Sequence, residues 1–320
     1  MRWGGYSGQY YYDQRGKTIY LSNVGTKAAR GNALEEQDAD GHSTGSFQLG
    51  RALARQLMGT WRSPDGRRQL PVRLLERYED AVQFQVEHWN LTRYLAPDSL
   101  RGPVGDSALF RGEYLRISLP QNPAAARRIA RAMAPPFAAP RMVFYLDTLL
   151  RNRQLDQPAY SFIGQKYVVY NSNNLFSVVQ FDSFSAEPES SYGSHEWTQG
   201  YTFDLRTGKQ LNLADLLVAG YQPKLRQLIL QQLRKFWKSY YTYDGVGRNG
   251  KLPASGFVVT GTGLQFTYDD RDEESLASPG PYHADREIKI TISYEALLPL
   301  IKVAGPLASV LRERNLLPKK

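Results

Sequence analysis

The sequence contains no cysteine. Disulfides, thiolate catalysis and cysteine-based zinc sites are therefore all excluded. No run of roughly 18 apolar residues occurs either, so the sequence predicts no transmembrane segment. The opening stretch, MRWGGYSGQYYYD, also lacks the apolar core of a secretory signal. We expect either a cytoplasmic protein or a mature chain from which a signal has been removed.

The usual fingerprints of catalysis and nucleotide binding are also missing. The sequence has no nucleophile elbow, P-loop or dinucleotide fingerprint. The segment TGTG at 260–263 indicates a hairpin turn, because no helix follows it. Without a convincing catalytic motif, we expect a protein that is not an enzyme, with no cofactor and no metal site.

The composition is that of a folded protein with many aromatic side chains. Hydrophobic residues make up 42% and charged residues 22% of 320 positions, and there are 21 tyrosines. Tyrosine is typical of half-buried sheet faces and binding surfaces, because it joins an apolar ring to a polar tip. The net charge is +9, but the basic residues are scattered, which disfavours a nucleic-acid partner. Nothing in the composition indicates an oligomeric state.

The first 160 residues contain a β-rich part and a mixed part. Residues 1–76 predict a small all-β module, cut into short strands by glycines and by the turn signal Ser63-Pro64-Asp65-Gly66. Residues 77–157 predict an α+β companion region, whose helix begins with Asn122 as N-cap and proline in the first turn. That helix carries Arg127, Arg128 and Arg131, either as an anion-binding face or, as we favour, as a solvated helix face.

The second half alternates strands with helices in no regular βαβ order, which favours an α+β fold. The segment QKYVVYNSNNLFSVVQFDSF predicts a hairpin with a polar four-residue turn. Residues 221–241 predict a long basic amphipathic helix, whose apolar stripe we expect to pack on a sheet rather than on a membrane. The predicted fold is thus an N-terminal all-β module followed by an α+β region, with an antiparallel sheet and a long amphipathic helix packed on it.

Short motifs in the region 158–302 follow one another in a familiar order. The motifs are Ser177, Gly193, His195, Phe203-Asp204-Leu205, Thr207-Gly208-Lys209, Leu213 to Leu217, Thr260, Gly263-Leu264-Gln265-Phe266 and Ile292 to Leu297. With these motifs the region resembles the C-terminal domain shared by the lysozyme-binding anti-sigma factor RsiV and the peptidoglycan deacetylase PdaC. The β-module is similar to modules of secreted bacterial proteins. We therefore predict four segments: the module at 1–76, the companion region at 77–157, the RsiV/PdaC-like domain at 158–304 and a helical tail at 305–320.

The resemblance implies an extracytoplasmic bacterial protein (periplasmic, secreted or lipoprotein-anchored) with a binding role. It does not imply deacetylase chemistry, which belongs to a separate catalytic domain that this sequence lacks. The family loop also differs here, because its second glycine is replaced, giving Tyr192-Gly193-Ser194-His195. The partner that the family suggests is a lysozyme-like protein; the aromatic content and the arginines suit a glycan or anionic polymer of the cell envelope instead.

Two histidine-containing clusters are the candidate site. A histidine with a neighbouring carboxylate can bind a metal or act as an acid/base pair, but adjacent side chains on a strand face opposite sides. We therefore favour ligand binding over catalysis for Tyr192, His195, Glu196, Trp197, Tyr282 and His283. For His195 alone, a hydrogen bond that stabilises a turn is the simpler interpretation. An acidic loop is a candidate contact for a basic partner such as lysozyme, through Asp269, Asp270, Asp272, Glu273 and Glu274. The alternatives are a metal- or His/Glu-dependent hydrolase of envelope glycans and a structural envelope protein.

Overall fold

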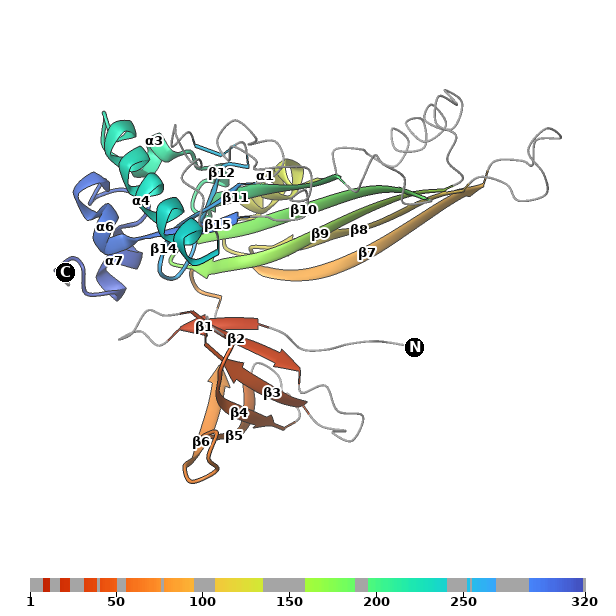
Figure 1. The fold of residues 1–320 in the computed structure, drawn as a ribbon, viewed down its shortest axis with the longest axis horizontal. Coiled ribbons are helices and arrows are strands. Elements are labelled where there is room, and N and C mark those ends of the chain that lie inside the picture. Colours follow the sequence, from red (N-terminus) through yellow and green to blue (C-terminus); the bar gives the residue numbers. More distant parts are fainter. Residues whose placement is uncertain are drawn as a thin grey trace. The chain divides into compact units, whose positions relative to one another are not determined.

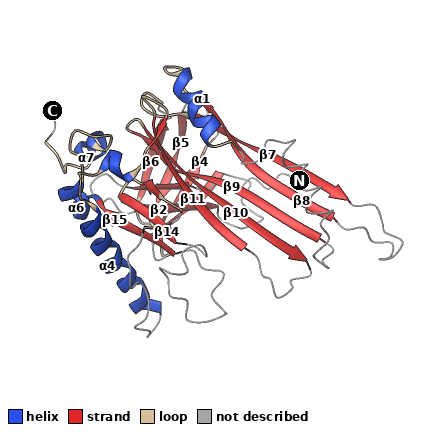
Figure 2. Ribbon diagram, turned by 90° about the horizontal axis from the view of Figure 1, so that it is seen from above, coloured by secondary structure: helices blue, strands red, loops and turns tan. Residues whose placement is uncertain are grey.

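The computed structural model describes residues 8–11, 18–23, 32–38, 41–50, 56–75, 78–94, 107–134, 159–187, 195–240, 252–253, 255–268 and 288–318. The chain divides into two compact units. One comprises residues 1–80 with 308–320, and the other residues 81–307. Strands dominate over helices, and the predicted α+β class is confirmed (Figure 2). The four-segment division remains a prediction.

The first unit contains a six-stranded sheet in which each strand pairs antiparallel with the next along the chain. Its strands are β1 (Gly8–Tyr11), β2 (Thr18–Asn23), β3 (Asn32–Gln37), β4 (Ser43–Leu49), β5 (Gln56–Arg62) and β6 (Gln69–Leu75). The predicted turn signal joins β5 to β6, where the Gly66 amide donates to the Ser63 carbonyl at 2.9 Å. The short helix α7 (Ala308–Glu313) belongs to the same unit.

The second unit is built on a larger six-stranded sheet in the order β12-β11-β10-β9-β8-β7. Its strands are β7 (Gln83–Tyr94), β8 (Ser107–Ser118), β9 (Ala159–Ser172), β10 (Leu175–Glu187), β11 (His195–Asp204) and β12 (Lys209–Gln210). All neighbours are antiparallel except β8 and β9. These two are parallel because the chain between them crosses over through helix α1 (Pro123–Ala132), as a parallel pair requires.

Helix α1 covers one end of the large sheet. Its Asn122 cap accepts a hydrogen bond from the Ala125 amide at 3.1 Å, as predicted. The helix buries Ala125, Ala126 and Ile129 in a core that it shares with apolar residues of β8, β10 and β11. Strands β7 to β10 run on well past the helix (Figure 1). The sheet therefore has an end that α1 covers and an end that α1 does not reach.

A three-stranded antiparallel sheet completes the second unit, with β13 (Phe257–Val259), β14 (Gly263–Tyr268) and β15 (Ile288–Ser293). Helix α4 (Gln222–Tyr240) packs against β15 and buries Leu225, Ile229 and Leu233. The prediction that its apolar stripe packs on a sheet is thus confirmed. The short helices α3 (Leu213–Leu216), α6 (Tyr294–Leu297) and η2 (Leu298–Leu300) also lie here. Among the described helices, none has the length and apolarity needed to cross a membrane.

The hairpin of β9 and β10 turns more tightly than predicted. Its turn consists of Asn173 and Asn174 alone, both with positive φ (57° and 60°), which is the conformation of a type I′ hairpin turn. Asn171 belongs to the strand, because its side chain accepts from the Val82 amide and donates to the Val82 carbonyl, both at 2.9 Å. The four-residue turn was wrong because this long-range contact holds Asn171 in β9.

Candidate functional site

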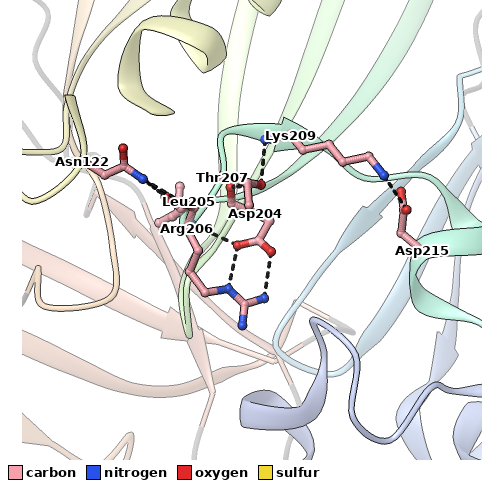
Figure 3. Close-up of polar contacts among 7 residues, drawn as sticks. All are labelled: Asn122, Asp204, Leu205, Arg206, Thr207, Lys209 and Asp215. Carbon is pink, nitrogen blue, oxygen red and sulfur yellow. Dashed lines mark hydrogen bonds and ion pairs between the residues drawn. The ribbon is translucent and has the colours of Figure 1, made fainter. Parts of the chain in front are cut away.

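The segment that carries most of the family resemblance forms a turn between β11 and β12 (Figure 3). We call residues 204–209 the docking turn. Asp204 is buried at 8% exposure, and its two carboxylate oxygens each accept from the Arg206 guanidinium at 2.8 Å. Hydrogen bonding to Asp204 raises the pKa of Arg206 further. The Asp204 carbonyl accepts from the Gly208 amide at 2.7 Å, which closes the turn.

The docking turn is attached to the first turn of α1. The Asn122 side-chain amide donates to the Arg206 carbonyl at 2.9 Å, and the Arg128 guanidinium donates to the Thr207 carbonyl at 2.9 Å. Gly208 has φ +70°, and a Cβ atom placed there would lie 2.7 Å from the Ala125 Cα. Only glycine fits this conformation and this close approach. The contacts of these motif residues are therefore contacts that hold the fold together.

The next motif segment begins helix α3 with a capping box. The Asn212 side chain accepts from the Asp215 amide at 3.0 Å, and the Asp215 carboxylate accepts from the Asn212 amide at 2.9 Å. Asp215 also pairs with the Lys209 ammonium at 2.5 Å. Partial burial is the largest influence and raises the pKa of Asp215, but the Asn212 amide and Lys209 together lower it below its usual value.

We expect Asp215→Asn to lower stability at neutral pH by about 0.5–1 kcal/mol, because the amide keeps the shape of the carboxylate but loses the negative charge that Lys209 and the start of the helix favour. A carboxyl whose folded-state pKa is lowered stabilises the protein above its unfolded-state pKa of 3.8, and that stability is lost as pH falls through the folded-state value. The variant should therefore lose less stability than the wild type between neutral and acidic pH. Urea unfolding at pH 7 and pH 3 measures this, and equal losses in both proteins would contradict it.

A different set of side chains lies on the same face of the large sheet, beyond α1. Directly opposed residues of antiparallel strands share a face. Val178, opposite Val168 and Tyr201, belongs to the core under α1. Two residues further along β10, Gln180 lies opposite Lys166 and Gln199, and two further still Asp182 lies opposite Gly164 and Trp197. Along β10, this face is thus apolar at Val178 and polar at Gln180, the next residue on the same side of the strand.

We call Lys166, Gln180 and Asp182 the polar row. The Lys166 ammonium donates to the Gln180 side-chain oxygen at 2.5 Å, and the Gln180 amide donates to the Asp182 carboxylate at 2.7 Å. All three are buried, at 7%, 7% and 6% exposure. Burial lowers the pKa of Lys166, and the carboxylates of Asp182 and Glu113 raise it part of the way back. The polar row thus carries a buried cation and a buried anion joined through one amide.

Aromatic rings lie beside the polar row. Trp197, directly opposite Asp182, contacts Phe162 with 6.1 Å between ring centroids, and Phe162 stacks on Phe110 at 5.8 Å. We call Phe162 and Trp197 the aromatic pair. Gly164 lies opposite Asp182 on the other side, and a Cβ there would come within 3.0 Å of its carboxylate. The absence of a side chain at Gly164 thus lets the Asp182 carboxylate and the Phe162 ring approach the strand backbone. Hydrogen-bonding groups and flat apolar rings therefore lie next to one another on this face of the sheet.

The predicted site residues meet this face at one position. Trp197 is half-buried within it. His195 and Glu196 begin strand β11, with their backbones paired to Phe184 and Ser183, so they lie in the strand rather than in the loop before it. The side chains of His195 and Glu196 lie outside the described part of the structure. So do the other predicted site residues, namely Tyr192, Tyr282, His283, Asp269, Asp270, Asp272, Glu273 and Glu274. The roles of all these residues stay predictions.

The sequence reasoning missed the polar row. Its signal was present in VVQFD, where Gln180 and Asp182 alternate with apolar residues. Their meaning depends on Lys166, which pairs with them only through the register of β9. In the residues that the structure describes, no group of three or more histidine, aspartate or glutamate side chains is arranged to hold a metal ion.

Three comparisons place the chain among known proteins. No family model matches the sequence, and a search of curated proteins gives no match. Among solved structures, the chain is similar to a DUF3298 family member from Bacteroides fragilis, with TM-score 0.52, 17% identity, and coverage of 74% of this chain and 99% of that one. A DUF3298 family protein from Pseudomonas aeruginosa matches at TM-score 0.41 and 17% identity, over 69% of this chain and 95% of that one. At this identity the first likeness concerns the fold alone: the chain has the fold of a bacterial domain of unknown function.

Proposed function

We propose that this chain is a non-enzymatic, extracytoplasmic binding protein of the bacterial cell envelope, and that it binds an envelope glycan. The observation that carries the proposal is the aromatic pair beside the polar row on one sheet face. Sugar rings present apolar C–H faces and many hydroxyl groups. An aromatic ring packs against the former, and charged or amide side chains hydrogen-bond the latter.

The polar row places charged and amide groups directly beside the aromatic pair. The Lys166 ammonium has three N–H donors, and it donates to the Gln180 oxygen at 2.5 Å. Asp182, which accepts from the Gln180 amide at 2.7 Å, lies two residues away on β10 and directly opposite Trp197. A sugar over Trp197 would thus have a carboxylate and an ammonium within the same patch of sheet.

A lysozyme-like partner is the less favoured choice. Lysozymes are usually basic, and this chain has a net charge of +9, so like charges oppose encounter unless an acidic patch compensates. The acidic residues at 269–274 that would form such a patch lie outside the described residues. The aromatic pair and the polar row, by contrast, have defined contacts.

Trp197→Ala should weaken glycan binding by about thirtyfold, because a central aromatic contact contributes about 2 kcal/mol. Calorimetric titration of the purified chain with soluble peptidoglycan fragments measures the effect. Tyr167→Ala is the matched control. Tyr167 is an aromatic residue of β9 that is 50% exposed, and its neighbour Lys166 belongs to the polar row, so the two side chains point to opposite faces. We expect the control to bind within about twofold of the wild type.

Other outcomes would replace the proposal. Equal losses in the two variants would remove the aromatic pair from the site, and no heat of binding for the wild type at millimolar fragment would overturn the glycan ligand. Retention on immobilised lysozyme, weakened by charge reversal at 269–274, would assign a protein partner instead. New reducing ends released from peptidoglycan, and lost in His195→Ala, would assign hydrolysis.

A further inference from the structure

The outer face of α1 carries three arginines and no acidic residue. Arg127, Arg128 and Arg131, which we call the arginine patch, are all exposed, while Ala125, Ala126 and Ile129 face the core. Residues three and four apart are neighbours on a helix surface, so the three guanidinium groups lie on one side. Like charges at this spacing weaken a helix slightly. Repulsion within the patch therefore gives the helix no stability, and only Arg131, in the last turn, interacts favourably with the helix dipole.

The two acidic residues in and beside the docking turn are already paired. Asp204 is paired with Arg206 in the docking turn, and Asp215 is paired with Lys209 (Figure 3). Within the described residues no ion pair involves the arginine patch. One member is fixed in position, because Arg128 donates to the Thr207 carbonyl at 2.9 Å. Among these described residues, the arginine patch with Arg206 and Lys209 carries five positive charges, and Asp204 and Asp215 carry two negative ones, which leaves an excess of three positive charges.

We propose that the arginine patch binds a linear polyanion, a polymer whose repeating units carry phosphate or carboxylate groups. Each of the three side chains is exposed, and a single exposed ion pair contributes little in water. A chain of anions gains affinity from several such contacts at once, because each neutralised anion releases a counterion. Arg127 and Arg131 are about 6 Å apart along the helix axis, so one polymer strand can contact both. The arginine patch lies on the outer side of α1, whereas the proposed glycan site lies on the sheet beyond the helix. Binding at one site can therefore be absent without affecting the proposal for the other.

The test is binding of fluorescently labelled polyphosphate and labelled alginate, a polycarboxylate, at about 50 mM salt. We expect the wild type to bind at least one of them, and the arginine-patch variant Arg127→Ala/Arg128→Ala/Arg131→Ala to bind at least tenfold more weakly. The slope of log affinity against log salt should fall by roughly two to three, one step for each lost contact. The phosphate and carboxylate polymers separate the two sources of anionic charge.

The matched control is Lys224→Ala/Arg234→Ala/Lys235→Ala, which removes three exposed charges from α4 and leaves α1 intact. We expect its affinity to stay within about threefold of the wild type. Equal weakening in both triple variants would reduce the effect to net charge and overturn the proposal. So would the absence of binding by the wild type, or binding of duplex DNA in preference to both polymers.

A second variant guards against a change in fold. Arg127→Ala/Arg131→Ala leaves the hydrogen bond from Arg128 to the docking turn in place. It should melt at the wild-type temperature and lose about two units of salt slope. An unchanged slope in this folded double variant would also overturn the proposal.

Discussion

Gly208→Ala is expected to lower the free energy of unfolding by about 3 kcal/mol. The left-handed backbone at φ +70° costs a side-chain-bearing residue about 1 kcal/mol. The added methyl group would also lie 2.7 Å from the Ala125 Cα and 2.8 Å from the Ala125 carbonyl oxygen. Relieving that overlap must move the docking turn away from α1, which adds about 1–3 kcal/mol.

Gly220→Ala is the control for the backbone term. Gly220 has φ +75°, and a Cβ there would meet nothing within 4 Å. It should therefore cost about 1 kcal/mol. Urea unfolding of both variants measures the difference, which isolates the close approach of the turn to α1. Equal losses would show that the turn moves freely and that α1 is not held through Gly208.

The sequence predicted those parts of the fold that local patterns determine. Asn122 and Pro123 are the first residues of α1 because a cap and a first-turn proline act on their own neighbours. The apolar stripe of α4 was predicted for a similar reason, because helical spacing is a local pattern. The family motif around Asp204 also has a physical meaning: its residues close a turn and attach it to α1.

Other features depend on which strands become neighbours, and a single sequence does not contain that register in local form. Lys166 and Gln180 are 14 residues apart and meet only because the β9–β10 hairpin turns at two asparagines. The placement of Asn171 in a strand depends on the backbone of Val82, 89 residues earlier. His195 was predicted as a site residue because histidine can bind metals and transfer protons. The polar row contains no residue type that indicates a site by itself.

Because the polar row is buried, removing one of its charges should destabilise the fold. Asp182→Asn keeps the shape of the side chain and removes the negative charge, so the buried Lys166 ammonium keeps only Glu113 of the two carboxylates that favour its charged form. Removing the partner of a buried charge costs about 3–5 kcal/mol, and we expect a loss of about 3 kcal/mol because Glu113 still compensates Lys166 in part. We expect that loss at pH 7, measured by urea unfolding.

The pH dependence identifies the cause. Burial already lowers the pKa of Lys166 in the folded wild type, so folding favours the neutral amine. Such a group destabilises the fold while it is protonated, and stability rises as pH increases from the lowered value toward the unfolded-state value of 10.5. Without Asp182 the folded-state pKa falls further, so the variant should begin to regain stability at a lower pH than the wild type does.

The double variant Lys166→Met/Asp182→Asn completes the cycle. It removes the Lys166 cation together with the Asp182 anion. The buried charge that is poorly compensated in the single variant is therefore absent from the double variant. It should be more stable at pH 7 than Asp182→Asn alone, and its stability should not rise between pH 8 and pH 10 in the way that the single variant's does. If the double variant instead loses the sum of the two single losses, the two charges do not interact through Gln180, and the polar row is three separate residues rather than one network.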